Sequence, residues 1–243
     1  MKICVDAGHN CSNYDTGAEG NGLREQDITF AIADKLKDYL HSVGISAVMT
    51  RPTLETNLGY DENSSLEERC VIANSLNCDY FVSIHCNSFP KTTANGTEVL
   101  IISEGGSAEK LAQCVQRNII NNVGTVDRGV KVQNAKVLRD TKMPAILVET
   151  AFISNSYDAQ ILKTQSHKIA MAIFWGICEY LGIDTQTKPE TPKELETVND
   201  IVWELAHKGI ISDKELWLEK LKTDTNSYWL ARKCVNYIRG KEL

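Results

Sequence analysis

Short runs of apolar residues alternate along the chain with segments whose apolar residues recur every three or four positions. The short runs predict strands over residues 2–7, 45–50, 80–86, 97–102 and 144–153, and a short extended segment over 136–139. Between them, the spacing predicts helices over residues 28–43, 66–76, 107–123 and 166–181. This alternation is typical of an α/β fold, in which helices flank both faces of a mostly parallel sheet.

The pattern changes near residue 184. The stretch DTQTKPETPKE contains two of the five prolines of the chain among polar residues, which predicts a linker over 184–193. Apolar residues at helical spacing then return, and Ser212 with Glu215 forms a capping-box pattern before another apolar run. We therefore expect a main domain over residues 1–183 and a small three-helix module over 194–243.

Charge and composition exclude several classes of protein. The net charge of −6 provides no basic surface for nucleic acid. The first residues, MKICVDAGHN, lack the apolar core of a signal peptide, and no run approaches the length of a membrane span, so synthesis in the cytoplasm is expected. The eight cysteines form no Cys-x-x-Cys pair, which favours buried reduced thiols.

Two histidines stand where strands are predicted to end. His9 follows the apolar run Ile3–Val5 in the sequence DAGHN, and Gly8 before it lets the backbone turn where a side chain would be in the way. His85 ends the apolar run FVSI in the same way. Because open α/β folds keep their sites at the carboxyl ends of strands, the two imidazoles are expected at one edge of the sheet.

Carboxylates supply the remaining candidate chemistry. Glu149 lies in the apolar run AILVETAF, where a lone buried carboxylate is costly unless a metal or an ion pair with Arg69 or Arg139 compensates it. Glu25 opens the first long helix, after the glycine-rich loop that contains its rival Glu19. Two imidazoles and one carboxylate commonly bind catalytic zinc, and a second carboxylate then transfers protons.

Four separated segments resemble the zinc-dependent N-acetylmuramoyl-L-alanine amidases of the amidase-3 family over residues 1–182. They are DAGHN, LREQDI, RCVIANSLNCDYFVSIHCNS and RGVKVQNAKVLRDTKMPAILVETAFISN. The resemblance implies an open, mostly parallel six-stranded sheet, zinc ligands His9, Glu25 and His85, and Glu149 as catalytic residue. The implied reaction is hydrolysis of the amide that joins N-acetylmuramic acid to L-alanine of the stem peptide. Cys86 and Ala151 replace the Ala and Gly that this family often has.

Two other functions are open at this point. A thiol enzyme would use Cys86 or Cys11 as nucleophile and a histidine as base, although neighbouring residues of a strand point to opposite faces, which separates Cys86 from His85. A non-catalytic peptidoglycan-binding regulator would keep the fold and lose a ligand, yet all four positions are present.

The biological setting suggested by the sequence is a phage or prophage endolysin, released to the bacterial cell wall through a holin. A mother-cell lysin of sporulation, or another autolysin of the same chemistry, is the alternative. Residues 194–243 would then recognise the wall, or join two chains into a homodimer through the aromatic residues Trp203, Trp217, Tyr228 and Trp229.

Overall fold

A six-stranded sheet organises the first of the two units into which the chain divides, residues 1–186 and 187–243. The computed structural model describes residues 1–184, 205 and 216–217. The predicted linker and three-helix module therefore lie almost entirely outside the described residues. Within the described part, no helix is both long enough and apolar enough to cross a bilayer.

The strands of the sheet follow the order β4-β1-β5-β8-β6-β7. Their bounds are Lys2–Ala7 (β1), Ser46–Met49 (β4), Tyr80–Asn87 (β5), Thr97–Ile101 (β6), Asp127–Val132 (β7) and Ala145–Phe152 (β8). Among the described strands of this sheet, only the β6–β8 pair is antiparallel, which confirms the mostly parallel sheet. Because β6 and β7 run in the opposite direction, they begin at the edge where β1, β5 and β8 end.

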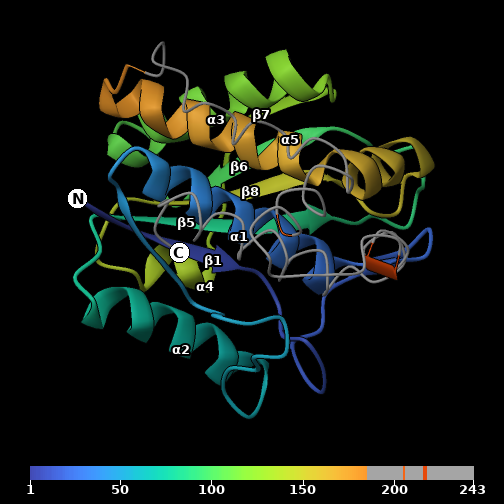
Figure 1. Ribbon diagram of the computed structural model, residues 1–243, viewed down its shortest axis with the longest axis horizontal. Helices are drawn as coiled ribbons and strands as arrows, with labels where there is room; N and C mark the ends of the chain where they lie inside the picture. Colours follow the sequence, from blue (N-terminus) through green and yellow to red (C-terminus); the bar gives the residue numbers. More distant parts are fainter. Residues whose placement is uncertain (185–204, 206–215, 218–243) are drawn as a thin grey trace. The chain divides into compact units, whose positions relative to one another are not determined.

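Helices cover the two faces of this sheet unequally (Figure 1). One face packs against the long helices α1 (Glu25–Ser42), α3 (Ser107–Val123) and α5 (Ser156–Leu181). The other face packs against α2 (Glu62–Ser75) and the four-residue α4 (Lys136–Arg139). A two-residue pairing, β2 (Glu19–Gly20) with β3 (Leu23–Arg24), precedes α1.

The face beneath α2 and α4 changes from apolar to polar along its strands. Cys4, Phe81 and Leu147 form the smaller apolar cluster there. Further along the same strands, alternation places Asp6, Ser83, His85 and Glu149 on this face. The apolar contacts of the smaller cluster thus stop short of the carboxyl edge, and polar side chains take their place at that edge.

Three elements differ from the sequence prediction. Residues 136–139 form helix α4 instead of an extended segment, and the sixth strand is Asp127–Val132. A four-residue apolar pattern cannot distinguish the two states, while β7 is an edge strand without a buried apolar run. Helix α5 begins at Ser156, because the side chain of Asn155 accepts hydrogen bonds from the amides of Tyr157 and Asp158.

Candidate active site

Three side chains from different elements converge at the carboxyl edge of the sheet. His9 follows β1, Glu25 is the first residue of α1, and His85 lies near the end of β5. The Oε1 atom of Glu25 lies 3.1 Å from His9 Nε2 and 3.1 Å from His85 Nδ1. One donor atom from each residue lies within 4.8 Å of the other two, a spacing that could hold a metal ion.

The donor set and its exposure fit a divalent cation of the zinc type. Imidazole nitrogens and a carboxylate oxygen are ordinary zinc ligands, and catalytic sites use three of them with one position left open. The side chain of Glu25 is 4% exposed, whereas those of His9 and His85 are 22% and 16% exposed. The protein therefore closes one side of the cluster and leaves the histidine side accessible to solvent.

Two glycines make this convergence possible. A Cβ on Gly8 would collide with the imidazole of His85, and a Cβ on Gly17 would lie 2.7 Å from Glu25 Oε2 and 2.8 Å from His9 Cδ2. The positive φ of +65° belongs to His9 and not to Gly8. A side chain at Gly8 would therefore be in the way of His85, as the sequence predicted, while the left-handed turn itself falls on His9.

Glu25 is held ionised in its buried position. Burial alone would raise the pKa of this carboxyl, but hydrogen bonds and charge interactions with His85 and His9 outweigh burial and lower it below its usual range. The backbone N–H of Ala18 donates to Oε2 at 2.8 Å, and that of Cys86 donates to Oε1 at 2.9 Å. These bonds fix the carboxylate in the form that a metal ligand requires.

His9 is oriented by a carboxylate that sequence reasoning missed. Asp15 Oδ1 lies 3.0 Å from His9 Nδ1, while the hydroxyl of Ser65 donates to Asp15 Oδ2 and Arg69 lies 3.5 Å from the same atom. Although burial opposes it, the bonds to Asp15 and Glu25 raise the pKa of His9 to about 10. A histidine whose second nitrogen contacts a carboxylate is typical of metal sites, because that contact fixes the ring.

The backbone at His9 is held by a buried arginine. Arg51 is fully buried, and its guanidinium donates to the carbonyl oxygens of Gly8 and His9 and to that of Gln26. Non-glycine residues at positive φ are uncommon and need such support from their surroundings. Arg51 therefore stabilises the turn that presents His9.

Glu149 lies beside this cluster with different surroundings. It pairs in register with His85 across the parallel strands β5 and β8, so both side chains project from the same face. Its Oε2 atom is buried and has no hydrogen-bond partner. Burial is the main cause that raises the pKa of Glu149 to about 7, and the nearby carboxylates of Glu25 and Glu98 add to it.

The ion pair considered for Glu149 is not formed. Arg69 bonds to Asp6 at 2.7 Å, and Arg139 bonds to Asp140 at 2.8 Å. Of the two carboxylates that competed for the third position, Glu25 joins the histidines, while Glu19 lies exposed on β2 with Arg24 at 3.7 Å.

Of the two cysteines considered as nucleophiles, Cys11 is partly exposed and Cys86 is buried, and the structure argues against Cys86. Cys86 is buried in the larger apolar cluster on the face opposite His85, and burial raises the pKa of its thiol well above the usual value. A thiol in such surroundings is a poor nucleophile. All seven cysteines among the described residues are free.

Glu98 is another residue that sequence reasoning missed. It stands opposite Glu149 in the antiparallel pairing of β6 and β8. Unlike Glu149 it is fully partnered, by Arg128 and Lys131 on Oε2 and by the amide of Asn87 on Oε1. Its sequence signal, a glutamate inside the apolar run TEVLII, is the same signal that identified Glu149.

A family model described as N-acetylmuramoyl-L-alanine amidase matches residues 3–179. The chain belongs to this amidase family. LytC, an N-acetylmuramoyl-L-alanine amidase of Bacillus subtilis (strain 168), is 37% identical over 182 residues, which cover 73% of this chain and 35% of LytC. The endolysin of Bacillus phage SPP1 is 33% identical over 198 residues, which cover 79% of this chain and 70% of the endolysin.

Solved amidase structures share the fold. The CwlD amidase from Clostridioides difficile, solved in complex with the GerS lipoprotein, superposes with a TM-score of 0.68 at 32% identity. The superposition covers 75% of this chain and 99% of that chain. The matched region is thus an amidase domain, and it contains the whole cluster described above.

Proposed function

We propose that this chain hydrolyses the amide between N-acetylmuramic acid and L-alanine of the stem peptide, with zinc held by His9, Glu25 and His85. Membership of the amidase family supports the reaction, and the close approach of two imidazole nitrogens to Glu25 Oε1 supports the metal assignment. When bound, zinc would polarise the scissile carbonyl and make water a better nucleophile at neutral pH.

Glu149 performs the proton transfers in this proposal. Its unpartnered oxygen is free to accept a proton from the attacking water and to deliver it to the nitrogen of the departing L-alanine. A pKa raised to about 7 suits a group that must act first as base and then as acid near neutral pH. The register of β5 and β8 supports this role, because Glu149 pairs with His85, one of the proposed ligands.

A digestion experiment tests the reaction and both assignments. Purified peptidoglycan is treated with wild-type protein, with chelator-treated protein before and after zinc is returned, and with Glu149→Gln. The matched control is Glu67→Gln, which changes an exposed glutamate on α2. Mass spectrometry should find new L-alanine amino termini with wild type and the control, none after chelation, and a restored product with zinc.

Other outcomes would contradict the proposal. New reducing sugar ends would indicate a glycosidase, and full activity of Glu149→Gln would exclude Glu149 as the proton-transfer group. Binding of peptidoglycan without any cleavage would support the regulator alternative.

We also propose an endolysin role for the whole protein, which acts on the bacterial cell wall after release. The similarity to the SPP1 endolysin, which extends over 70% of that protein, supports it. Purified protein should lower the turbidity of vegetative host cells whose membranes have been permeabilised. Activity restricted to sporulating cells would favour the sporulation lysin instead.

Residues 194–243 are proposed to recognise the wall or to form a homodimer. Light scattering on the full chain separates these roles. A monomer that sediments with insoluble peptidoglycan more strongly than residues 1–186 alone would indicate wall recognition by the module, and a dimer of the expected mass would indicate self-association.

A further inference from the structure

A bulge in β7 places two cations on the face of the sheet that carries Glu149. One residue of β6, Glu98, separates Thr97 from Val99, whereas two residues of β7 separate their partners Asp127 and Val130. The extra position includes Gly129, whose φ is +76°. Such bulges recur beside functional sites, where they redirect side chains.

Without the bulge, these two cations would point in opposite directions. Arg128 and Lys131 are three residues apart, and residues at that spacing in a regular strand lie on opposite faces. Here both contact the same atom, Glu98 Oε2, with Arg128 Nε at 2.6 Å. The additional residue therefore brings both side chains to one face.

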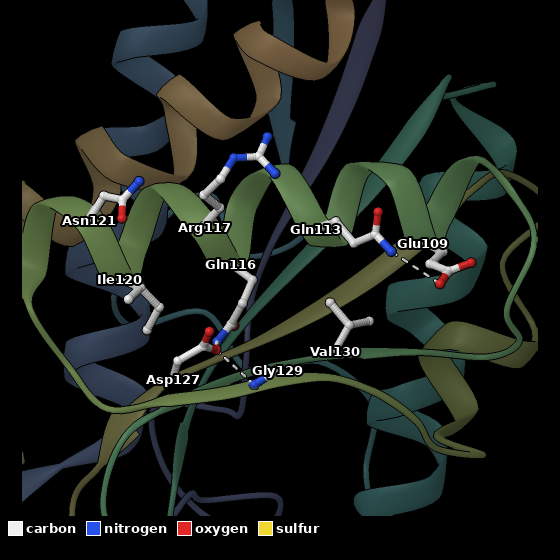
Figure 2. Close-up of a pocket in the computed structure, with 9 residues that line it drawn as sticks. All are labelled: Glu109, Gln113, Gln116, Arg117, Ile120, Asn121, Asp127, Gly129 and Val130. Carbon is white, nitrogen blue, oxygen red and sulfur yellow. Dashed lines mark hydrogen bonds between the residues drawn. The ribbon is translucent and has the colours of Figure 1, made fainter.

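The bulge is fixed from the opposite face of the sheet. Figure 2 shows Asp127 in the shallow pocket between α3 and β7, where its Oδ1 accepts hydrogen bonds from Gly129 N at 2.9 Å and from Gln116 Nε2 at 2.6 Å. Arg128 is held in addition by the ring of Phe152, 4.8 Å from its guanidinium. The position of the cations is thus built into the fold.

These cations lie beside the candidate active site. Glu98 is directly opposite Glu149, and Glu149 is directly opposite His85, so the polar groups form a row from β5 across β8 and β6 to β7. One carboxylate neutralises only one of the two cations, which leaves a net charge of +1 at the end of the row. The side chains of Arg128 and Lys131 are 33% and 43% exposed, so a ligand can reach them.

We propose that Arg128 and Lys131 form a subsite for one carboxylate of the stem peptide, on the L-alanine side of the scissile amide. This inference rests on the proposed function. The glycan offers hydroxyl and acetamido groups but no free anion once the lactyl carboxyl is in the amide, so the peptide must supply the charge. Two strand spacings of about 4.8 Å separate β8 from β7, and an extended peptide spans about 3.3 to 3.6 Å per residue. The carboxylate therefore belongs to the second or third residue.

Matched synthetic substrates test this subsite. Two pairs of N-acetylmuramoyl tripeptides are compared. The two members of a pair differ in one group, which is a free carboxylate in one and a carboxamide in the other. That group belongs to the second residue in the first pair and to the third residue in the second pair. Wild-type protein should prefer the carboxylate form of one pair by about tenfold in kcat/KM, because a hydrogen bond to a charged group is lost in the carboxamide. The preference should lie in KM.

Variants assign the preference to Lys131. Lys131→Gln keeps Arg128 as the partner of Glu98 and should remove most of the carboxylate preference, while Lys131→Arg should restore it. The matched control is Arg117→Gln, which breaks an exposed pair with Glu179 between α3 and α5 and should keep the wild-type ratio. Thermal unfolding of each variant shows that it is folded.

The outcomes separate this inference from the proposed function. Hydrolysis of all substrates without a carboxylate preference would overturn the subsite alone, as would a wild-type preference in Lys131→Gln. Failure of wild-type protein to cleave any substrate would overturn the proposed function and the subsite together.

Discussion

Glu98 and Glu149 face each other across the β6–β8 pair, yet the protein treats them in opposite ways. Glu98 receives bonds from Arg128, Lys131 and Asn87, and charge contacts lower its pKa although burial opposes them. Glu149 has a buried oxygen without a partner, and its pKa is raised to about 7.

The contrast shows that cationic side chains at this edge of the sheet can pair with a buried carboxylate. They do so at Glu98, one strand away from Glu149. Leaving Glu149 unpartnered is therefore a specific feature of its position. Such a feature costs stability and is retained where a reaction needs a free base.

The largest expected effect is the loss of turnover in Glu149→Gln. Removal of a general acid and base typically lowers kcat by about 10²- to 10⁴-fold. Glu98→Gln keeps Glu149 and should retain far more of the kcat. Release of peptide from soluble muramyl peptides, followed by chromatography, measures both. A similar loss of kcat in the two variants would remove the functional distinction between them.

The next effect concerns the stability of the metal-free protein. Because the folded-state pKa of Glu149 is raised from 4.5 to about 7, the folded state binds an extra proton between these values, and stability falls as pH rises through them. Glu149→Gln should therefore stabilise the metal-free protein at pH 8, by up to about 3 kcal/mol, and should have little effect at pH 4.

Glu98→Gln should show the opposite sign in the same experiment. The folded-state pKa of Glu98 is lowered, so its contribution to stability is present above the unfolded pKa and is lost as pH falls. Denaturant unfolding at several pH values measures both variants. Destabilisation by Glu149→Gln at pH 8 would show that its carboxylate has partners in solution.

A smaller effect is expected at Asp15. Its carboxylate contacts the ring of His9, just as the guanidinium of Arg128 contacts the carboxylate of Glu98. Asp15→Asn weakens the contact that orients the imidazole and should reduce zinc affinity by about 10- to 100-fold. Competition with a chromophoric chelator measures this affinity. Glu149→Gln serves as the comparison, because it should alter turnover and leave zinc binding near the wild-type value. Unchanged affinity in Asp15→Asn would show that His9 is oriented without it.

The smallest effect is expected at Cys86, next to His85 in the chain but on the opposite face. Cys86→Ala should keep kcat within about a factor of two, because a buried thiol with a raised pKa is inert. Treatment of wild-type protein with iodoacetamide should likewise leave the buried Cys86 unmodified. Loss of activity after alkylation at Cys86 would revive the thiol mechanism.

Sequence patterns predicted the parts of this molecule that depend on burial. The strands β1, β5, β6 and β8 carry continuous apolar runs, so their positions could be read directly. Strand β7 could not, because an exposed edge strand with a glycine bulge has neither an apolar run nor an alternating pattern.

The candidate site was predictable where polar residues interrupt apolar runs, as at His85 and Glu149. Asp15 and Arg51 were missed for a physical reason. Each acts through a contact with His9, and such contacts depend on how a loop and a distant strand end meet, which no local pattern encodes.

The zinc content of purified wild-type, His85→Ala and Glu149→Gln protein shows whether His9, Glu25 and His85 hold a metal ion while Glu149 transfers protons. We expect one zinc ion per chain in active wild-type protein, the same content and similar affinity in inactive Glu149→Gln, and little or no zinc in His85→Ala. Active wild-type protein without zinc, or loss of zinc in Glu149→Gln, would contradict this assignment.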